Sequence, residues 1–307
     1  MPTTSPQYDV IIIGGGPAGL SAALWCADLG LKAILLERES EFGGQLLRTF
    51  NRIQNYPGIE DATGVDIRDR FLGQVKKTSV ERRSGVAISR VDLAGRALEF
   101  EDGSMLESKA IIIATGVRRR KLGVPGEDKF GGHGVLDSGV RNRNNLSGKS
   151  VVIVGGGDAA LENAIILGET AASVTLVHRS GEFRARSEFL EKAAAMPNVT
   201  LVPNRVVTAI LGCENVTGIE LRDAKTSESS QLSADAMLIR IGVAPNNELF
   251  HGQLAVDENG YIKVDSTCAT NIEDVFAIGD VANPIAPTIC SAAGMGATAA
   301  KAAANCL

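Results

Sequence analysis

The chain has 307 residues, of which 44% are hydrophobic and 22% charged, and its formal net charge is −5. This length is where a single hydrophobic core stops growing, so two domains are expected, and the charge gives no reason to expect nucleic acid or an anionic membrane as a partner. No apolar stretch reaches membrane-spanning length without a Gly, a Pro or a charge, so we expect a cytoplasmic protein with a small-molecule or protein partner. The five cysteines show no CxxC spacing, which argues against a disulfide framework and against a zinc site.

Apolar, β-branched runs alternate along the chain with Ala-rich stretches of helical period. This alternation is typical of buried parallel strands followed by crossover helices. The sequence therefore predicts an α/β fold with two Rossmann-like, three-layer ββα dinucleotide-binding domains, the second inserted in the first. The expected strands lie in residues 8–15, 31–37, 109–116, 149–156, 172–179 and 236–242, and the expected helices in residues 18–30, 158–169 and 294–306.

The strand–helix cycle starts near Tyr8 and starts again near Lys149. The stretch "VFAIGDV" then returns to an apolar strand before the last Ala-rich helix, without a third glycine turn, and we expect it to complete the first domain. The predicted bounds are residues 1–118 and 247–307 for the first, discontinuous dinucleotide-binding domain and residues 119–246 for the second, inserted one.

The first glycine turn lies in "IIIGGGPAGL", where Gly14, Gly16 and Gly19 match G-x-G-x-x-G between an expected strand and an expected helix. Such a turn brings the backbone close to a pyrophosphate, which binds at the helix N-terminus. Glu37 ends the next expected strand, where a carboxylate accepts hydrogen bonds from ribose hydroxyls. The pattern predicts one dinucleotide site here.

The second turn, "VVIVGGGDAA", offers Gly155, Gly157 and Ala160 in a G-x-G-x-x-A pattern. At the spacing that leads from Gly14 to Glu37, this turn leads to His178, and Arg179, Ser180 and Arg184 follow it. Guanidinium groups bind a ribose 2′-phosphate, which a carboxylate would repel. The sequence therefore favours NADPH over NADH at this second site.

Several motifs besides the turns carry a resemblance that covers nearly the whole chain. They are "GGQL" from Gly43, "NYPG" from Asn55, "IIIATG" ending at Gly116 and "VFAIGDV" around Asp280. With the two glycine turns, they make the chain resemble the low-molecular-weight thioredoxin reductases and related two-dinucleotide flavoproteins. The resemblance implies FAD in the discontinuous domain, NADPH in the inserted domain and a homodimer.

The resemblance also assigns site residues. It places Gly44, Gln45 and Asn55 near the isoalloxazine ring, and Asp280 on the ribityl chain. The residues expected to contact FAD are Gly14, Gly16, Pro17, Ala18, Gly19, Glu37, Arg38, Gly44, Gln45, Asn55, Ala114, Thr115, Gly116, Gly279, Asp280 and Thr288. Those expected to contact NADPH are Gly155, Gly157, Asp158, Ala159, Ala160, His178, Arg179, Ser180, Arg184 and Gly242.

The sequence departs from the resemblance at the dithiol. In thioredoxin reductases a CxxC pair precedes the second glycine turn, whereas here Ser138 and Arg141 stand at the corresponding positions. A hydroxyl and a guanidinium cannot form a disulfide, so a dithiol relay is not expected. Among the single cysteines, Cys290 is a candidate redox thiol, because it lies close to the start of the last expected helix and a helix N-terminus lowers a thiol pKa.

The sequence leaves the electron acceptor open. A ferredoxin or flavodoxin, a quinone or similar small molecule, and a disulfide reached through a single cysteine all fit a flavoenzyme without a CxxC pair. Two other functions also fit: a flavoprotein redox sensor or binding module without turnover, and a flavoenzyme fed by ferredoxin that does not use NADPH.

Overall fold

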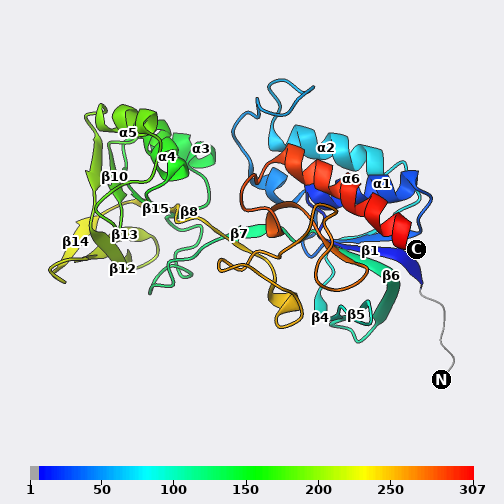
Figure 1. Cartoon of the computed structure of the whole chain (residues 1–307). Helices are drawn as coiled ribbons and strands as arrows, with labels where there is room; N and C mark the ends of the chain where they lie inside the picture. Colours follow the sequence, from blue (N-terminus) through cyan, green and yellow to red (C-terminus); the bar gives the residue numbers. More distant parts are fainter. Residues whose placement is uncertain (1–6) are drawn as a thin grey trace. The chain divides into compact units, whose positions relative to one another are not determined.

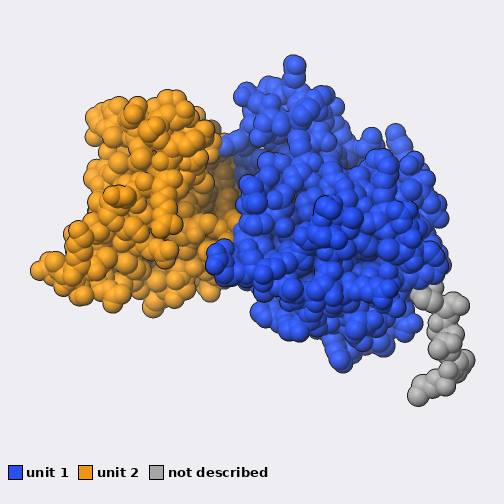
Figure 2. Space-filling view, viewed as in Figure 1, with its two compact units in different colours: residues 1–118, 244–307 blue, residues 119–243 orange. Residues whose placement is uncertain are grey.

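The computed structural model of the protein describes residues 7–307. The chain divides into two compact units: unit 1 comprises the residues up to Arg118 together with Ala244–Leu307, and unit 2 comprises Arg119–Val243 (Figure 2). The chain passes between the units along β7 (Val117–Arg119) and β16 (Val243–Pro245), which form a separate two-stranded sheet. In residues 7–307, no helix is both long enough and apolar enough to cross a bilayer.

Unit 1 contains a seven-stranded sheet in the order β3-β2-β1-β6-β5-β4, with β17 also paired to β6. The nine-residue strand β6 has two roles, because residues 108–113 pair parallel with β1 whereas residues 105–107 pair antiparallel with β5. The strands are β1 (Tyr8–Ile13), β2 (Ala33–Leu36), β3 (Glu81–Arg83), β4 (Ile88–Asp92), β5 (Ala97–Phe100), β6 (Met105–Ile113) and β17 (Val275–Ala277).

Alternate residues of β1 face different layers, because side chains along a strand point to opposite faces of the sheet. Val10 and Ile12 pack in a core with α1 (Pro17–Asp28), α2 (Gly64–Val75) and α6 (Ile289–Cys306), which lie together over one face (Figure 1). Ile11 and Ile13 pack in a second core with β4 and β5. This is the predicted three-layer arrangement, and β17 supplies the returning strand. The short 3-10 helices are η1 (Gly44–Arg48), η3 (Glu248–Phe250) and η4 (Gly279–Val281).

Unit 2 repeats the plan around a parallel sheet in the order β11-β10-β9-β15-β8. One face carries α4 and α5, and the other packs against an antiparallel sheet of β12, β13 and β14. The elements are β8 (Val135–Leu136), α3 (Gly139–Asn142), η2 (Arg143–Leu146), β9 (Ser150–Val154), α4 (Asp158–Gly168), β10 (Ser173–Val177), α5 (Ser187–Ala194), β11 (Val199–Val202), β12 (Arg205–Gly212), β13 (Val216–Asp223), β14 (Ser229–Ser233) and β15 (Ala236–Ile239). The predicted fold class, with two Rossmann-like domains, is confirmed.

Candidate functional site

The first glycine turn joins β1 to α1 and leaves no room for side chains at two of its positions. Gly14 has φ +110°, and a Cβ there would lie 2.3 Å from the Ala114 carbonyl oxygen. A Cβ on Gly19 would lie 1.9 Å from the Gly14 oxygen, so only glycine lets helix and strand approach this closely. Gly16, the N-cap of α1, differs: the nearest heavy atom to a Cβ there is the Gly44 Cα, at 4.0 Å. The start of α1 therefore faces open space, which suits a phosphate group.

Glu37 lies at the end of β2 with its carboxylate already engaged by the backbone. One oxygen accepts a hydrogen bond from the Gly15 N–H at 2.8 Å, and the other accepts from the Glu39 N–H at 2.9 Å. The side chain is buried, yet it lines the cavity described next. Because an ionised carboxylate has about four acceptor positions, Glu37 retains acceptors for ribose hydroxyls while it fixes the turn.

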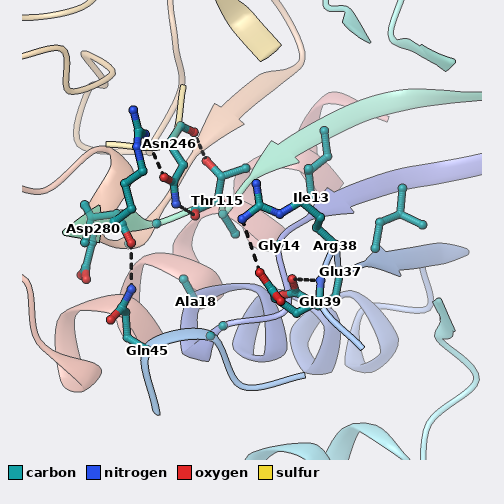
Figure 3. Close-up of a pocket in the computed structure, with 18 of the residues that line it drawn as sticks. Ile13, Gly14, Ala18, Glu37, Arg38, Glu39, Gln45, Thr115, Asn246 and Asp280 are labelled. Carbon is teal, nitrogen blue, oxygen red and sulfur yellow. Dashed lines mark hydrogen bonds and ion pairs between the residues drawn. The ribbon is translucent and has the colours of Figure 1, made fainter. Parts of the chain in front are cut away.

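A cavity of about 710 Å³ opens in unit 1 beside the turn, and Glu37, Gln45, Thr115 and Asp280 surround it (Figure 3). All residues predicted to contact FAD line this cavity except Gly19, Asn55 and Thr288. Gly19 lies beneath the turn, and Thr288 caps α6 by accepting from the Ser291 N–H. The carbonyl oxygen of the exposed Asn55 accepts from the Cys290 thiol at 3.8 Å.

Asp280 presents a half-buried carboxyl group to the cavity, and burial raises its pKa. Across residues 7–307, no hydrogen-bond donor is found for this carboxyl group. A buried polar group without a partner is costly, and hydroxyl donors from a ligand would relieve that cost. Together with the open N-terminus of α1 and the acceptors of Glu37, these residues fit FAD, which has a pyrophosphate, a ribose and a ribityl chain.

The sequence prediction missed Asn246, which also lines this cavity. Its side-chain amide donates to the Thr115 carbonyl at 2.8 Å, and the Thr115 hydroxyl donates back to the Asn246 carbonyl at 2.6 Å. The predicted bounds put Asn246 in the inserted domain, whereas the compact unit that contains it is unit 1. The predicted boundary after residue 246 lies three residues beyond the end of unit 2 at Val243.

The second glycine turn, in unit 2, joins β9 to α4 in the same way. A Cβ on Gly155 would lie 2.2 Å from the Arg240 carbonyl oxygen, whereas a Cβ on Gly157, the N-cap of α4, would have no heavy atom within 4 Å. The backbone N–H of Arg184 donates to the Gly156 carbonyl at 2.7 Å. This bond ties the basic loop, residues 178–186 after β10, to the turn. The residues predicted for NADPH lie at this turn, at the start of α4 and after β10, except Gly242, which follows β15.

His178 forms the floor of that loop. A Cβ on Gly156 would lie 2.3 Å from the His178 ring, which also packs against Phe183 with ring centroids 5.2 Å apart. Burial, and then the Arg179 charge, lower the pKa of His178 and so favour its neutral ring. Its role in the fold is packing, which leaves the cationic contacts to the arginines.

The three arginines of the loop have different surroundings. Arg186 is paired with Asp158 at 2.9 Å and accordingly has its charge matched. Arg179 and Arg184 are exposed, and in the part of the chain that the structure describes neither has a carboxylate within ion-pair distance. Two exposed guanidinium groups beside the end of β10 fit the 2′-phosphate of NADPH.

Ser138 and Arg141, at the positions of the expected dithiol, belong to the start of α3. Ser138 is buried, and its hydroxyl oxygen accepts from the Arg141 backbone N–H at 3.3 Å. The serine therefore acts as a helix cap.

An α/β protein with one glycine-turn site in each of two Rossmann-like units belongs to the class of two-dinucleotide oxidoreductases. The profile of the family described as pyridine nucleotide-disulphide oxidoreductase matches residues 8–304. The chain belongs to this family, and its membership implies FAD and NADPH as cofactors.

Individual relatives agree with this family. The chain is 39% identical over 300 residues to a thioredoxin reductase of Streptomyces clavuligerus, covering 96% of this chain and 92% of the relative. It is 38% identical to that of Mycolicibacterium smegmatis, covering 97% and 96% of the two chains. Among solved structures, the Lactococcus lactis thioredoxin reductase in its FR conformation aligns with a TM-score of 0.84 at 33% identity, covering 97% of this chain and 98% of that one.

Proposed function

We propose that the protein is an NADPH oxidoreductase that holds FAD in unit 1 and NADPH in unit 2, and that delivers electrons to an acceptor without a CxxC dithiol. The observation that carries this proposal is the combination of two open glycine turns, at Gly16 and Gly157, with a helix-capping serine at position 138. When bound, FAD takes up a hydride from NADPH and passes the electrons on. The chain contributes binding, orientation and charge.

Particular side chains of unit 1 would hold FAD. The first turn of α1 would bind the pyrophosphate, Glu37 the adenosine ribose and Asp280 the ribityl hydroxyls. Gln45 donates to the Val117 carbonyl at 2.7 Å and thereby fixes η1 against the strand that follows Thr115 and Gly116. In unit 2, Gly157 would admit the pyrophosphate, and Arg179 and Arg184 the 2′-phosphate.

The missing dithiol limits which electron acceptors fit this protein. The curated relatives are named thioredoxin reductases, but this chain has no cysteine pair at the corresponding position. The acceptors that fit are a ferredoxin or flavodoxin, a quinone or similar small molecule, and a disulfide reached through one cysteine. The proposal includes a homodimer, as the resemblance implies, and a cytoplasmic location.

Anaerobic mixing of the FAD-loaded protein with NADPH tests the proposal. We expect the oxidised flavin absorption to bleach within seconds and to return when an acceptor is added. A panel containing ferredoxin, flavodoxin and a quinone would then rank the acceptors. A flavin that bleaches over many minutes, or not at all, would instead identify a redox sensor or a ferredoxin-fed enzyme.

A second expected result concerns donor specificity. Arg179→Ala should lower kcat/KM for NADPH on the order of tenfold to a hundredfold, because a charge-assisted hydrogen bond to the phosphate contributes about 1.5–3 kcal/mol before solvent screening. With NADH the same variant should change little, since NADH has no 2′-phosphate. Flavin reduction measured with both donors separates the cases. Equal losses with the two donors would show that Arg179 supports the fold and does not recognise the cofactor.

A further inference from the structure

Arg240 is a half-buried guanidinium that, in residues 7–307, forms no ion pair with a carboxylate. It directly follows β15, and its Nη atoms donate to the carbonyls of Ile239 at 2.9 Å and of Asp137 at 2.8 Å. Within the described residues, no carboxylate lies at ion-pair distance from it, whereas Arg143 of the same unit is paired with Glu169 at 2.6 Å. A partly buried cation held only by main-chain carbonyls is costly, which makes Arg240 a candidate functional residue.

The surroundings of Arg240 are cationic. Arg119 also donates to the Asp137 carbonyl, which brings two guanidinium groups to one oxygen. Burial and then the Arg119 charge lower the pKa of Arg240 to about 10, and the Asp137 carboxylate opposes this more weakly. Arg240 is thus charged at neutral pH, and the end of β15 has a positive potential.

The strand order places this charge relative to the cofactor. Unit 2 has the order β10-β9-β15-β8, with the arginines that fit the 2′-phosphate at the end of β10 and the glycine turn between β9 and α4. A dinucleotide that lies across the carboxyl ends of these strands must continue from the turn over β15. The backbone of Arg240 lies directly beside the turn, since its N–H donates to the Val154 carbonyl at 2.7 Å, and its guanidinium reaches the Asp137 carbonyl after β8. With the pyrophosphate at the turn, the half of the cofactor expected over β15 is the nicotinamide nucleoside.

We propose that Arg240 is a specificity-determining residue that favours the reduced cofactor over the oxidised one in unit 2. The inference rests on the NADPH site proposed above. The nicotinamide ring is neutral in NADPH and carries a positive charge in NADP⁺, so a nearby guanidinium repels only the product. Neighbouring strands of a sheet lie about 4.8 Å apart. A nicotinamide ring over β15 would therefore lie close enough to the Arg240 guanidinium for a charge interaction that solvent screens only in part. The consequence is faster release of NADP⁺ and weaker product inhibition.

Calorimetry on the oxidised, FAD-loaded protein tests this without catalysis. The two ligands are NADP⁺ and tetrahydro-NADP, whose ring is neutral and cannot donate a hydride. In Arg240→Gln we expect the ratio of the Kd for NADP⁺ to the Kd for tetrahydro-NADP to fall about three- to tenfold, chiefly because NADP⁺ binds more tightly. Arg240→Lys should keep most of the ratio. Arg143→Gln, which removes an arginine with its own carboxylate partner, should keep all of it.

An unchanged ratio in Arg240→Gln would overturn the inference. If neither Kd value changes, the charge of Arg240 does not reach the ring; if both rise equally, Arg240 acts on the pyrophosphate that both ligands share. If neither ligand binds the wild-type protein, the NADPH site itself is wrong. Should Arg240→Gln fail to fold, the exposed Arg119→Gln provides the second test: we expect the same direction with about a twofold change, and no change would contradict the proposal.

Discussion

Replacing Gly16 with valine is expected to give a folded protein that is colourless. Gly16 has φ −72° and ψ −175°, an extended conformation that any residue adopts, and no protein atom lies closer than 4.0 Å to the position of its Cβ. The protein itself therefore leaves room for a Cβ here, and the valine side chain would project over the start of α1, where the FAD pyrophosphate is proposed to bind. Because phosphate binding there depends on direct contact with backbone N–H groups, we expect FAD affinity to fall by about a thousandfold or more.

Visible absorption of the purified variant, FAD released on denaturation and the thermal unfolding temperature together measure this result. The matched control is Gly157→Val in unit 2, where the glycine is also extended, at φ −104°, and a Cβ meets nothing within 4 Å. That variant should stay yellow and lose NADPH binding. A yellow Gly16→Val protein with one FAD per chain would show that the pyrophosphate lies elsewhere.

The parts of the fold that could be predicted from the sequence are those that local signals specify. The run "YDVIII" forms a buried strand and Gly14 to Gly19 form the turn into α1, because β-branched residues favour strands and the glycines meet steric demands within a few residues. The same holds for β9 and α4 in unit 2. Glu37 could be predicted as a site residue because it stands at the end of β2, the next strand along the chain.

Contacts between residues far apart in the chain could not be predicted in this way. Asn246 meets Thr115 across 131 positions, and its own neighbours show only a turn signal. Arg240 looks like an ordinary end of a strand in the sequence, and its position beside the glycine turn appears only once β15 pairs with β9. Asn55 and Thr288, assigned by resemblance, are not among the residues that line the cavity, and their contact with FAD stays a prediction.

The surroundings of the five cysteines bear on whether another pair of thiols could replace the CxxC dithiol. Burial raises the pKa of Cys26 to about 12 and that of Cys268 to about 11, so neither forms the thiolate that thiol–disulfide exchange requires. Cys290 and Cys306 lie near opposite ends of α6, about 24 Å apart at 1.5 Å per residue, which is far beyond the reach of a disulfide. Cys213 lies in unit 2 without a second cysteine near it in sequence. These observations support the proposal that electrons leave the flavin without a CxxC dithiol.

We therefore expect NADPH-dependent reduction of a standard thioredoxin to be at least about a hundredfold slower than with a thioredoxin reductase assayed in parallel, a barrier difference of at least about 2.7 kcal/mol. The relatives with that name make this a sharp test, since a shared fold and shared cofactors would otherwise predict the same acceptor. The control is the same preparation's anaerobic flavin bleaching by NADPH, which shows that the donor half of the reaction works. Turnover comparable to that of the reference enzyme would contradict the proposal, and loss of that turnover in a Cys213→Ser, Cys290→Ser or Cys306→Ser variant would identify the thiol that takes the place of the dithiol.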